Sequence, residues 1–179
     1  MGPVDSYLRQ AQGGFRLGRS TADIVWAHRW LVGKVLRYKG IIHVLGLDMS
    51  RAFDTIDRTK LLSVLESVPG LSDDDRRLIR ILLANTSIRV FFNGHETDPF
   101  VSNIGSPQGD GLSPILFAIY LEAALREFDA RGPTRPSKDV NVGLPYNAIY
   151  ADDADFISLD LDFLNKVIRE VGPIFGESD

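Results

Sequence analysis

The chain has 179 residues, of which 44% are hydrophobic and 25% charged, so it is long enough for one domain with a hydrophobic core and is not broadly disordered. It has no cysteine, which excludes disulfides, thiolate metal sites and cysteine nucleophiles. The net charge of −4 argues against a freestanding polyanion binder, and no apolar run is long enough to span a bilayer. We expect an intracellular protein, in the nucleus or the cytoplasm, that does not bind membranes.

The charge is distributed unevenly along the chain. Residues 1–40 hold seven Lys or Arg and two Asp, which gives +5, whereas the remaining 13 basic and 22 acidic residues give −9. A basic amino-terminal segment joined to an acidic body could place a nucleic acid or a phosphate beside a metal site. The alternative is solvated charge on helix surfaces.

The first predicted elements are a long helix and a buried strand. Ser20 is placed to cap a helix over Thr21–Tyr38, which carries apolar residues at helical spacing. Ile41–Leu47 is a short, mostly apolar run with β-branched residues, which predicts a buried strand that ends at Asp48.

Two capped helices follow. Asp57 caps a predicted helix over Arg58–Val68. Ser72 with Asp75 three residues later resembles a capping box and opens a helix to about Asn85.

The next stretch predicts a hairpin and a buried helix. Ile88–Phe92 and Phe100–Ile104 flank an Asn93-Gly94 turn signal, which indicates a β-hairpin with a longer loop. Ser113-Pro114 supplies an N-cap and a proline at the first helical position, and the apolar run Ile115–Leu125 continues the helix.

The last elements are two strands and a helix, after a loop over Arg131–Asp139. Tyr146–Ala151 and Ala154–Leu159 read as strands around Asp152-Asp153, and a helix covers roughly Leu161–Val171. The order predicts an α+β domain with helices packed on one face of an antiparallel sheet.

Three carboxylates stand at the ends of these strands. Asp48 ends the first strand, and Asp152 and Asp153 occupy the tip of a tight hairpin, where Asp is also common for purely structural reasons. If the three converge, each like-charge pair at about 4 Å is unfavourable by about 4 kcal/mol, so the cluster needs cations. Oxygen ligands favour Mg²⁺ or Mn²⁺, and two such ions can stabilise the attacking and leaving oxygens of a phosphoryl transfer.

A glycine-rich loop from Gly105 to Pro114 precedes the apolar helix. Its three glycines allow close approach of a nucleotide or a backbone, and Gln108 can hydrogen-bond bases or sugars without adding charge. By composition alone, an ordinary turn into a capped helix is the better explanation of the loop.

Four motifs in order resemble those of reverse transcriptases. They are Gln12-Gly13-Gly14-Phe15-Arg16-Leu17-Gly18-Arg19-Ser20-Thr21, Leu47-Asp48-Met49-Ser50-Arg51-Ala52-Phe53-Asp54, Pro107-Gln108-Gly109 and Tyr150-Ala151-Asp152-Asp153. The first resembles the motif just upstream of motif A in non-LTR retrotransposon polymerases. The other three resemble motifs A, B and C of reverse transcriptases, in that order. Gly111 departs from the proline found in many of these enzymes.

The resemblance implies a role for each matching residue. Asp48, Asp152 and Asp153 would be the catalytic, metal-binding carboxylates for two Mg²⁺ or Mn²⁺ ions, with the Met49 carbonyl in the metal shell. The remaining implied contacts are the Arg51 and Ala52 backbone with the triphosphate, Phe53 as a steric gate against ribose, Gln108 and Gly109 with nucleotide and template, and Arg16 and Arg19 with template or phosphate.

The resemblance also implies an architecture. We expect a polymerase palm, with a ferredoxin-like (RRM-like) antiparallel sheet and helices on one face, over residues 41–179, partial fingers over 1–40 and no thumb. The implied function is an RNA-directed DNA polymerase that adds dNTPs to a DNA primer on an RNA template, with self-association through surface that a thumb would cover. The alternatives are a catalytically weak or inactive scaffold or nucleic-acid-binding module and, disfavoured by Phe53 and the Pro-Gln-Gly loop, an RNA-dependent RNA polymerase.

Other noticeable residues receive structural interpretations. Capping or turn roles are expected for Asp54 and Asp57, loop support for Asp110, a surface strand position for Asp155, packing or solvation for His28, His43 and His95, core positions for Phe91, Phe92 and Phe117, and both core and site lining for Tyr150.

Overall fold

The computed structural model describes residues 2–49, 51–84, 86–107 and 109–175. The chain forms two compact units, one made of Met1–Tyr7 and Arg51–Tyr120 and the other of Leu8–Ser50 and Leu121–Asp179. Helix α5 (Ser113–Arg131) contributes residues to both. We call them the arm unit and the sheet unit.

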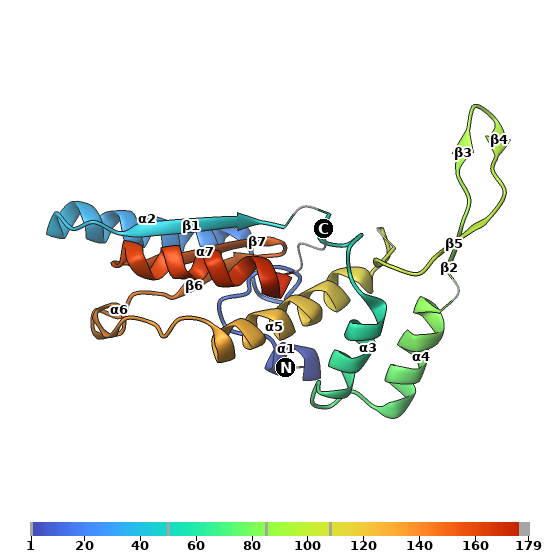
Figure 1. Cartoon of the computed structure of the whole chain (residues 1–179), viewed down its shortest axis with the longest axis horizontal. Coiled ribbons are helices and arrows are strands. Elements are labelled where there is room, and N and C mark those ends of the chain that lie inside the picture. The colour runs from blue at the N-terminus through green and yellow to red at the C-terminus, as the bar shows by residue number, and fades with distance from the viewer. Residues whose placement is uncertain (1, 50, 85, 108, 176–179) are drawn as a thin grey trace. The chain divides into compact units, whose positions relative to one another are not determined.

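The sheet unit is built around three antiparallel strands, and its elements are drawn in Figure 1. The strand order is β1-β7-β6, with β7 in the centre. The elements are α2 (Thr21–Tyr38), β1 (His43–Asp48), α6 (Ser137–Asn141), β6 (Asn147–Tyr150), β7 (Asp153–Ser158) and α7 (Leu161–Phe175).

Both faces of this sheet are covered. Phe156 of β7 is fully buried and lies edge-on against Phe128 of α5, with ring centroids 5.4 Å apart. On the opposite face, Leu31 of α2 packs with Ala148 and Ile157. Helices were predicted on one face of the sheet, and α5 packs on one face. Helix α2, which was expected in the fingers segment, packs on the other face.

The capping signal gave accurate limits for α2, whereas α7 continues to Phe175, beyond the predicted Val171. Helix α2 begins after Ser20 and ends at Tyr38 as predicted, and a capping box formed by Ser20 and Asp23 closes its first turn. The short α6 was not predicted, because its first residues overlap the proline-containing stretch Arg131–Asp139 interpreted as a loop. The predicted boundary between fingers and palm at residue 40 stays a prediction.

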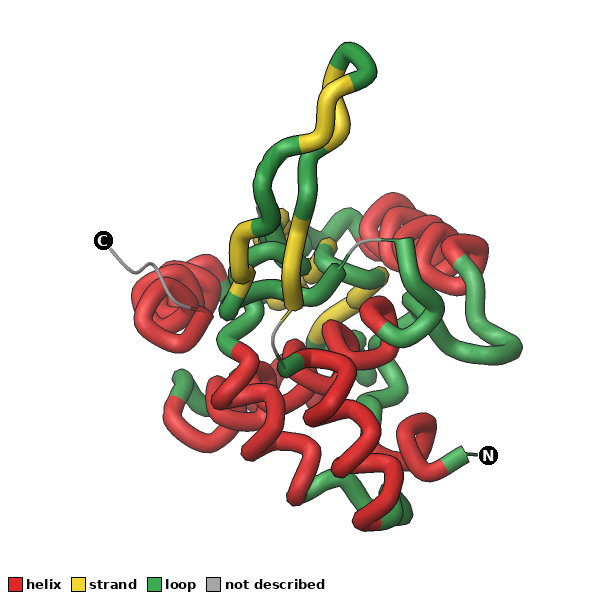
Figure 2. The backbone as a smooth tube through the Cα atoms, turned by 90° about the vertical axis from the view of Figure 1, so that its right-hand side faces the viewer, coloured by secondary structure: helices red, strands yellow, loops and turns green. Residues whose placement is uncertain are grey.

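The arm unit contains two neighbouring helices and a long two-stranded arm, seen from the side in Figure 2. Asp57 caps α3 by accepting hydrogen bonds from the backbone of Thr59 and Lys60, and Ser72 and Asp75 form the predicted capping box of α4. The elements are α1 (Pro3–Tyr7), α3 (Arg58–Glu66), α4 (Asp73–Leu83), β2 (Thr86–Ile88), β3 (Phe91–Phe92), β4 (His95–Glu96) and β5 (Phe100–Ser102).

The arm forms the predicted hairpin, which consists of two separate pairs of strands. Strand β2 pairs with β5 at its base, and β3 pairs with β4 around the Asn93-Gly94 turn, where both residues have positive φ. The prediction that Phe91 and Phe92 fill the core is wrong, because they are 74% and 72% exposed. A two-stranded ribbon has two open faces, so its side chains are buried only where another element covers them. Phe117 is buried as predicted.

No helix in the described part of the chain is long and apolar enough to cross a membrane. The apolar helix predicted with Ser113 as its N-cap begins one residue earlier, at Ser113 itself, and continues to Arg131, beyond the predicted Leu125. Most of its buried residues lie within the apolar run Ile115–Leu125.

Candidate active site

The two strands that carry the predicted carboxylates are direct neighbours. Strand β1 ends at Asp48, β7 begins at Asp153, and their antiparallel register places these two residues opposite each other. Cα atoms of such partners lie about 4.5–5.5 Å apart. In the described residues, no hydrogen bond or ion pair engages either side chain, and both residues are exposed. Two uncompensated carboxylates therefore share one end of the sheet.

The face of the sheet that carries Asp153 forms an open pocket beside α2. Residues alternate between the two faces of a strand, so Asp153 shares its face with Asp155 and, across the ladder, with Tyr150. The pocket is lined by Thr21, Ile24, Val25, Gly46, Leu47, Asp48, Ala148, Tyr150, Asp153 and Asp155. The lining combines acidic oxygens with an apolar wall, and Tyr150 contributes to the site as expected.

Asp152 occupies the turn between β6 and β7, outside the ladder. Among the described residues, Asp152 has no partner in the strand ladder, so the register that places Asp153 opposite Asp48 does not fix its position. Within residues 2–49, 51–84, 86–107 and 109–175, no group of three or more His, Cys, Asp or Glu side chains is close enough to hold a metal ion. The structure thus brings together two of the three predicted carboxylates and leaves the third at the adjacent turn.

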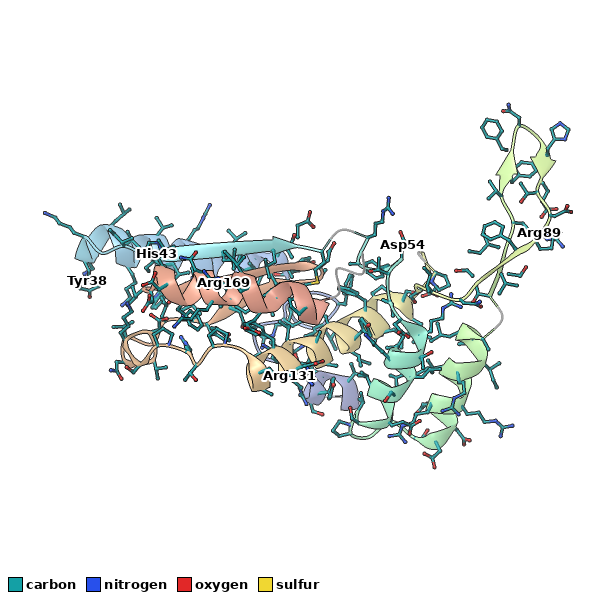
Figure 3. The ribbon with its side chains drawn as sticks, viewed as in Figure 1. Tyr38, His43, Asp54, Arg89, Arg131 and Arg169 are labelled. Atoms are coloured by element: carbon teal, nitrogen blue, oxygen red, sulfur yellow. The ribbon has the colours of Figure 1, made fainter. Side chains whose placement is uncertain are left out.

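The end of the second motif, Leu47–Asp54, lies in a tight turn of the arm unit. Arg51 has a positive φ, and its carbonyl accepts hydrogen bonds from the backbone of Asp54 and Thr55. These hydrogen bonds give Asp54, labelled in Figure 3, the predicted turn role. Ala52 is buried, whereas Arg51 is exposed.

Phe53, the predicted gate, is half-buried within the same unit. Its ring packs on that of Phe117 in α5, with centroids 4.8 Å apart and the planes tilted by 34°. One side of the Phe53 ring is thereby supported by a buried neighbour.

The glycine-rich loop is bonded to this turn. Gly105 N–H donates to the Ile56 carbonyl and Ser106 N–H to the Phe53 carbonyl, both at 2.8 Å. Gly105 has a φ of +74°, and a Cβ there would lie 2.7 Å from the Asp54 carbonyl oxygen. Only glycine allows these two segments to approach so closely.

Asp110 stabilises the loop as predicted. Its Oδ1 accepts hydrogen bonds from the backbone N–H of Ser113 at 2.6 Å and of Leu112 at 2.9 Å, at the start of α5. The hydrogen bond from Ser113 is the main reason that the pKa of Asp110 lies below its ordinary value. The carboxylate thus acts as a cap.

A sequence profile described as reverse transcriptase (RNA-dependent DNA polymerase) matches residues 2–177. The chain belongs to the reverse transcriptase family. It is 27% identical over 113 residues to the retrovirus-related Pol polyprotein from type-1 retrotransposable element R2 of Popillia japonica, which covers 63% of this chain and 18% of that protein. It is 32% identical over 131 residues to an uncharacterized 91 kDa protein in the cob intron of Schizosaccharomyces pombe, with 69% and 14% covered.

Solved structures similar to this chain include two telomerases. Apo telomerase from Candida tropicalis has a TM-score of 0.62 at 15% identity, covering 94% of this chain and 34% of that one. Candida albicans telomerase, in complex with a fragment of telomeric RNA, has a TM-score of 0.58 at 14% identity, covering 95% and 29%. These likenesses confirm the α+β polymerase palm fold. The chain spans less than one fifth of the curated relatives' length.

The first reverse transcriptase motif supplies structural contacts. Arg16 is buried, and its Nη1 donates to the carbonyls of Arg9 and Gln12 at 2.8 and 3.2 Å. Arg19 is half-buried and donates to the Gln10 side chain. The template contacts implied for both arginines stay predictions, and the observed contacts add a role in fixing the chain.

Of three other residues with implied contacts at the nucleotide site, the structure describes two. Met49 follows β1 directly, and Gly109 is exposed with a φ of +96°. Gln108 lies outside the described residues.

Two residues with structural interpretations form a pair beside the pocket. His28 Nε2 of α2 lies 2.8 Å from Asp155 Oδ2, and its Nδ1 lies 2.9 Å from the Ile24 carbonyl oxygen. Sequence reasoning assigned them separately, as a solvated or packed histidine and a surface aspartate. The pairing joins residues 127 positions apart, so no local pattern could reveal it.

Arg58 was not identified from the sequence. Its side chain is buried and donates to the carbonyls of Leu83, Ser102 and Gly105 and to Thr86 Oγ1, at 2.7 to 3.0 Å. It thus joins α3 to the end of α4, the base of the arm and the glycine-rich loop. Burial lowers its pKa from the ordinary value.

Proposed function

We propose that this chain contributes the palm-centred catalytic core of an RNA-directed DNA polymerase, which transfers deoxynucleotides from dNTPs to a primer 3′-hydroxyl. The observation that carries the proposal is the register that sets Asp48 opposite Asp153 at the open end of the sheet. Membership of the reverse transcriptase family supplies the reaction class. The catalytically inactive scaffold remains the competing function that the experiment below tests.

The carboxylates at the end of the sheet suit divalent ions. Asp48 and Asp153 present hard oxygen donors, and in the part of the chain that the structure describes no cationic side chain neutralises them. Asp48 and Asp153, joined by Asp152 and the Met49 carbonyl, would hold two Mg²⁺ or Mn²⁺ ions. When bound, such ions stabilise the charge that develops on the attacking and leaving oxygens.

The other residues of the motifs would position the nucleotide. The backbone N–H groups of Arg51 and Ala52 would bind the triphosphate, and Gln108 and Gly109 would line the pocket for the base pair. Phe53, supported by Phe117, would crowd a ribose 2′-hydroxyl and so favour deoxynucleotides. These roles amount to positioning and electrostatic stabilisation, the main sources of rate enhancement in phosphoryl transfer.

We propose RNA template and DNA primer as the partners, together with self-association of the chain. Affinity for a nucleic-acid backbone grows with the number of phosphates neutralised, and the acidic balance beyond residue 40 limits that number. We therefore expect weak primer–template binding with a shallow salt dependence. Exposed apolar residues such as Trp26, Phe91 and Phe92 favour self-association, which sedimentation measures.

Manganese binding and primer extension test the proposal together. Thermal unfolding is followed with increasing Mn²⁺, and extension on an RNA template is assayed with Mn²⁺ or Mg²⁺. Occupancy at about 100 times Kd adds about 2.7 kcal/mol to the free energy of unfolding. We expect Asp153→Ala to reduce this response, Asp152→Ala to abolish extension, and the control Asp98→Ala, an exposed aspartate of the arm, to change neither.

The opposite result identifies the competing function. A wild-type melting curve that does not respond to millimolar Mn²⁺, together with binding of nucleic acid but no extension, would support the inactive scaffold.

A further inference from the structure

The segment Ala11–Gly14 runs along the free edge of the sheet beside the catalytic turn. Gly13 N–H donates to the Ile149 carbonyl at 2.8 Å, and Ile149 N–H donates to the Ala11 carbonyl at 3.0 Å. These bonds form a parallel bridge between Gln12 and Ile149 of β6. The first sequence motif thus lies against the strand that leads into the Ala151-Asp152 turn.

The side chain of Gln12 reaches the turn itself. Gln12 is only 2% exposed, and its Oε1 accepts hydrogen bonds from Gly14 N–H at 2.7 Å and from Ala151 N–H at 3.2 Å. Its Nε2 lies 3.4 Å from the Ala151 carbonyl oxygen, to which it donates. One carboxamide therefore holds both backbone polar groups of Ala151.

Ala151 needs this support. Its φ is +56°, in the left-handed region that disfavours residues with a Cβ, and two-residue hairpins usually place glycine or asparagine at such positions. The next two residues are Asp152 and Asp153. A rotation at Ala151 would therefore move both carboxylates and disturb the alignment of Asp153 with Asp48.

Gln12 is itself held in place. Arg16 donates to the carbonyls of Arg9 and Gln12, and Arg9 bonds the buried carboxylate of Glu122 through both its backbone N–H and its Nε, each at 3.0 Å. Gly14 lies so close to the turn that a Cβ there would overlap the backbone nitrogen of Ala151. The carboxamide is thus presented to the turn from a fixed segment.

We propose that Gln12 is a positioning residue of the catalytic site: its carboxamide fixes the Ala151 turn and thereby keeps Asp153 opposite Asp48. The inference rests on the proposed polymerase function. Its simpler competitor is a buried glutamine that satisfies backbone groups and contributes to stability alone.

The experiment compares Gln12→Met, which keeps the length and removes the hydrogen bonds, with Gln12→Asn, which keeps the amide but shortens its reach. The control is Asn147→Leu, which removes a buried amide from the far end of β6, away from the turn. Asn147 Nδ2 has no hydrogen-bond partner in the described structure. The readouts are amide hydrogen exchange at Ala151 and Gly14, Mn²⁺ affinity by electron paramagnetic resonance, and the kcat and KM for dNTP.

We expect both Gln12 variants to exchange the Ala151 and Gly14 amides at least about tenfold faster, and to bind Mn²⁺ about tenfold more weakly, the range found for residues that orient metal ligands. Extension should show a lower kcat with little change in the KM for dNTP. The control should keep the exchange at Ala151 and the Mn²⁺ affinity within about twofold of wild type. If Gln12→Met does not fold, Gln12→Asn decides.

Two results would overturn the inference: wild-type exchange at Ala151 in a folded Gln12 variant, or wild-type Mn²⁺ affinity in that variant. A wild-type chain that binds no Mn²⁺ would instead count against the proposed function, and faster exchange at Ala151 in the Gln12 variants would then establish only that Gln12 holds the turn.

Discussion

The two hairpins of this molecule look alike in sequence and differ in what surrounds them. Both consist of apolar runs on either side of a turn signal. In the β6–β7 hairpin, Ile149 and Phe156 are fully buried, because helices cover both faces of the sheet. In the arm, Phe91 and Phe92 are among the most exposed aromatic residues.

The difference shows that an apolar strand pattern predicts strand formation better than it predicts burial. The arm is tied to its unit at its base, where Arg58 bonds the Ser102 carbonyl and Thr86. Farther out, Arg89 forms an exposed ion pair with Glu96 (Figure 3). The β6–β7 hairpin, in contrast, is held at its tip by Gln12. We therefore expect mutations to be most disruptive at the base of the arm but at the tip of the β6–β7 hairpin.

The sharpest contrast is between two phenylalanines. Phe156→Ala removes a fully buried ring from the sheet and should lower the free energy of unfolding by about 3–5 kcal/mol. Phe91→Ala on the arm should change it by less than about 0.5 kcal/mol. Denaturant unfolding measures both, and a similar loss in the two variants would show that the arm is packed in solution.

The second contrast is between two arginines of the arm unit. Arg58→Met removes the hydrogen bonds to the carbonyls of Leu83, Ser102 and Gly105, two of them buried, and should lower the free energy of unfolding by about 3 kcal/mol. Arg89→Met loses only an exposed ion pair and should lower it by less than about 1 kcal/mol. Equal effects on chemical denaturation would refute the assignment of Arg58 as the anchor of the arm.

A third contrast concerns the proposed chemistry, in which the sheet unit carries the carboxylates and the arm unit carries the gate. Phe53→Val removes the ring that would crowd the 2′-hydroxyl and should reduce discrimination between dNTP and NTP about tenfold. Phe117→Leu, which weakens the support of that ring, should have a smaller effect in the same direction. Incorporation ratios measure both, and a ratio unchanged in Phe53→Val would remove this residue from the gate role.

The smallest effect is expected at a partnered carboxylate of the arm unit. Because hydrogen bonding lowers the pKa of Asp110 in the folded chain, its cap stabilises the protein at pH values above the unfolded pKa. That contribution is lost as the pH falls through the lower, folded pKa. The melting temperature of wild type should therefore exceed that of Asp110→Ala near neutral pH, and the gap should close in acid. A gap that does not change with pH would contradict the cap.

Local chemistry determined much of what could be predicted from the sequence. Ser20, Asp57 and the Ser72–Asp75 pair cap helices within three residues of their own positions, so their roles follow from short-range geometry. The end of β1 at Asp48 and the turn at Asn93-Gly94 are equally local. The ordered motifs were sufficient to indicate the reverse transcriptase family.

Tertiary structure alone decided the contacts that assemble the site. The β1–β7 register sets Asp48 opposite Asp153, and Gln12 bonds Ala151, which lies 139 residues away in the chain. Arg58 finds its acceptors 25 to 47 residues away, and the exposure of Phe91 depends on which elements leave the arm uncovered. Local propensity acts over one turn of chain, whereas these contacts exist only after distant segments have packed together.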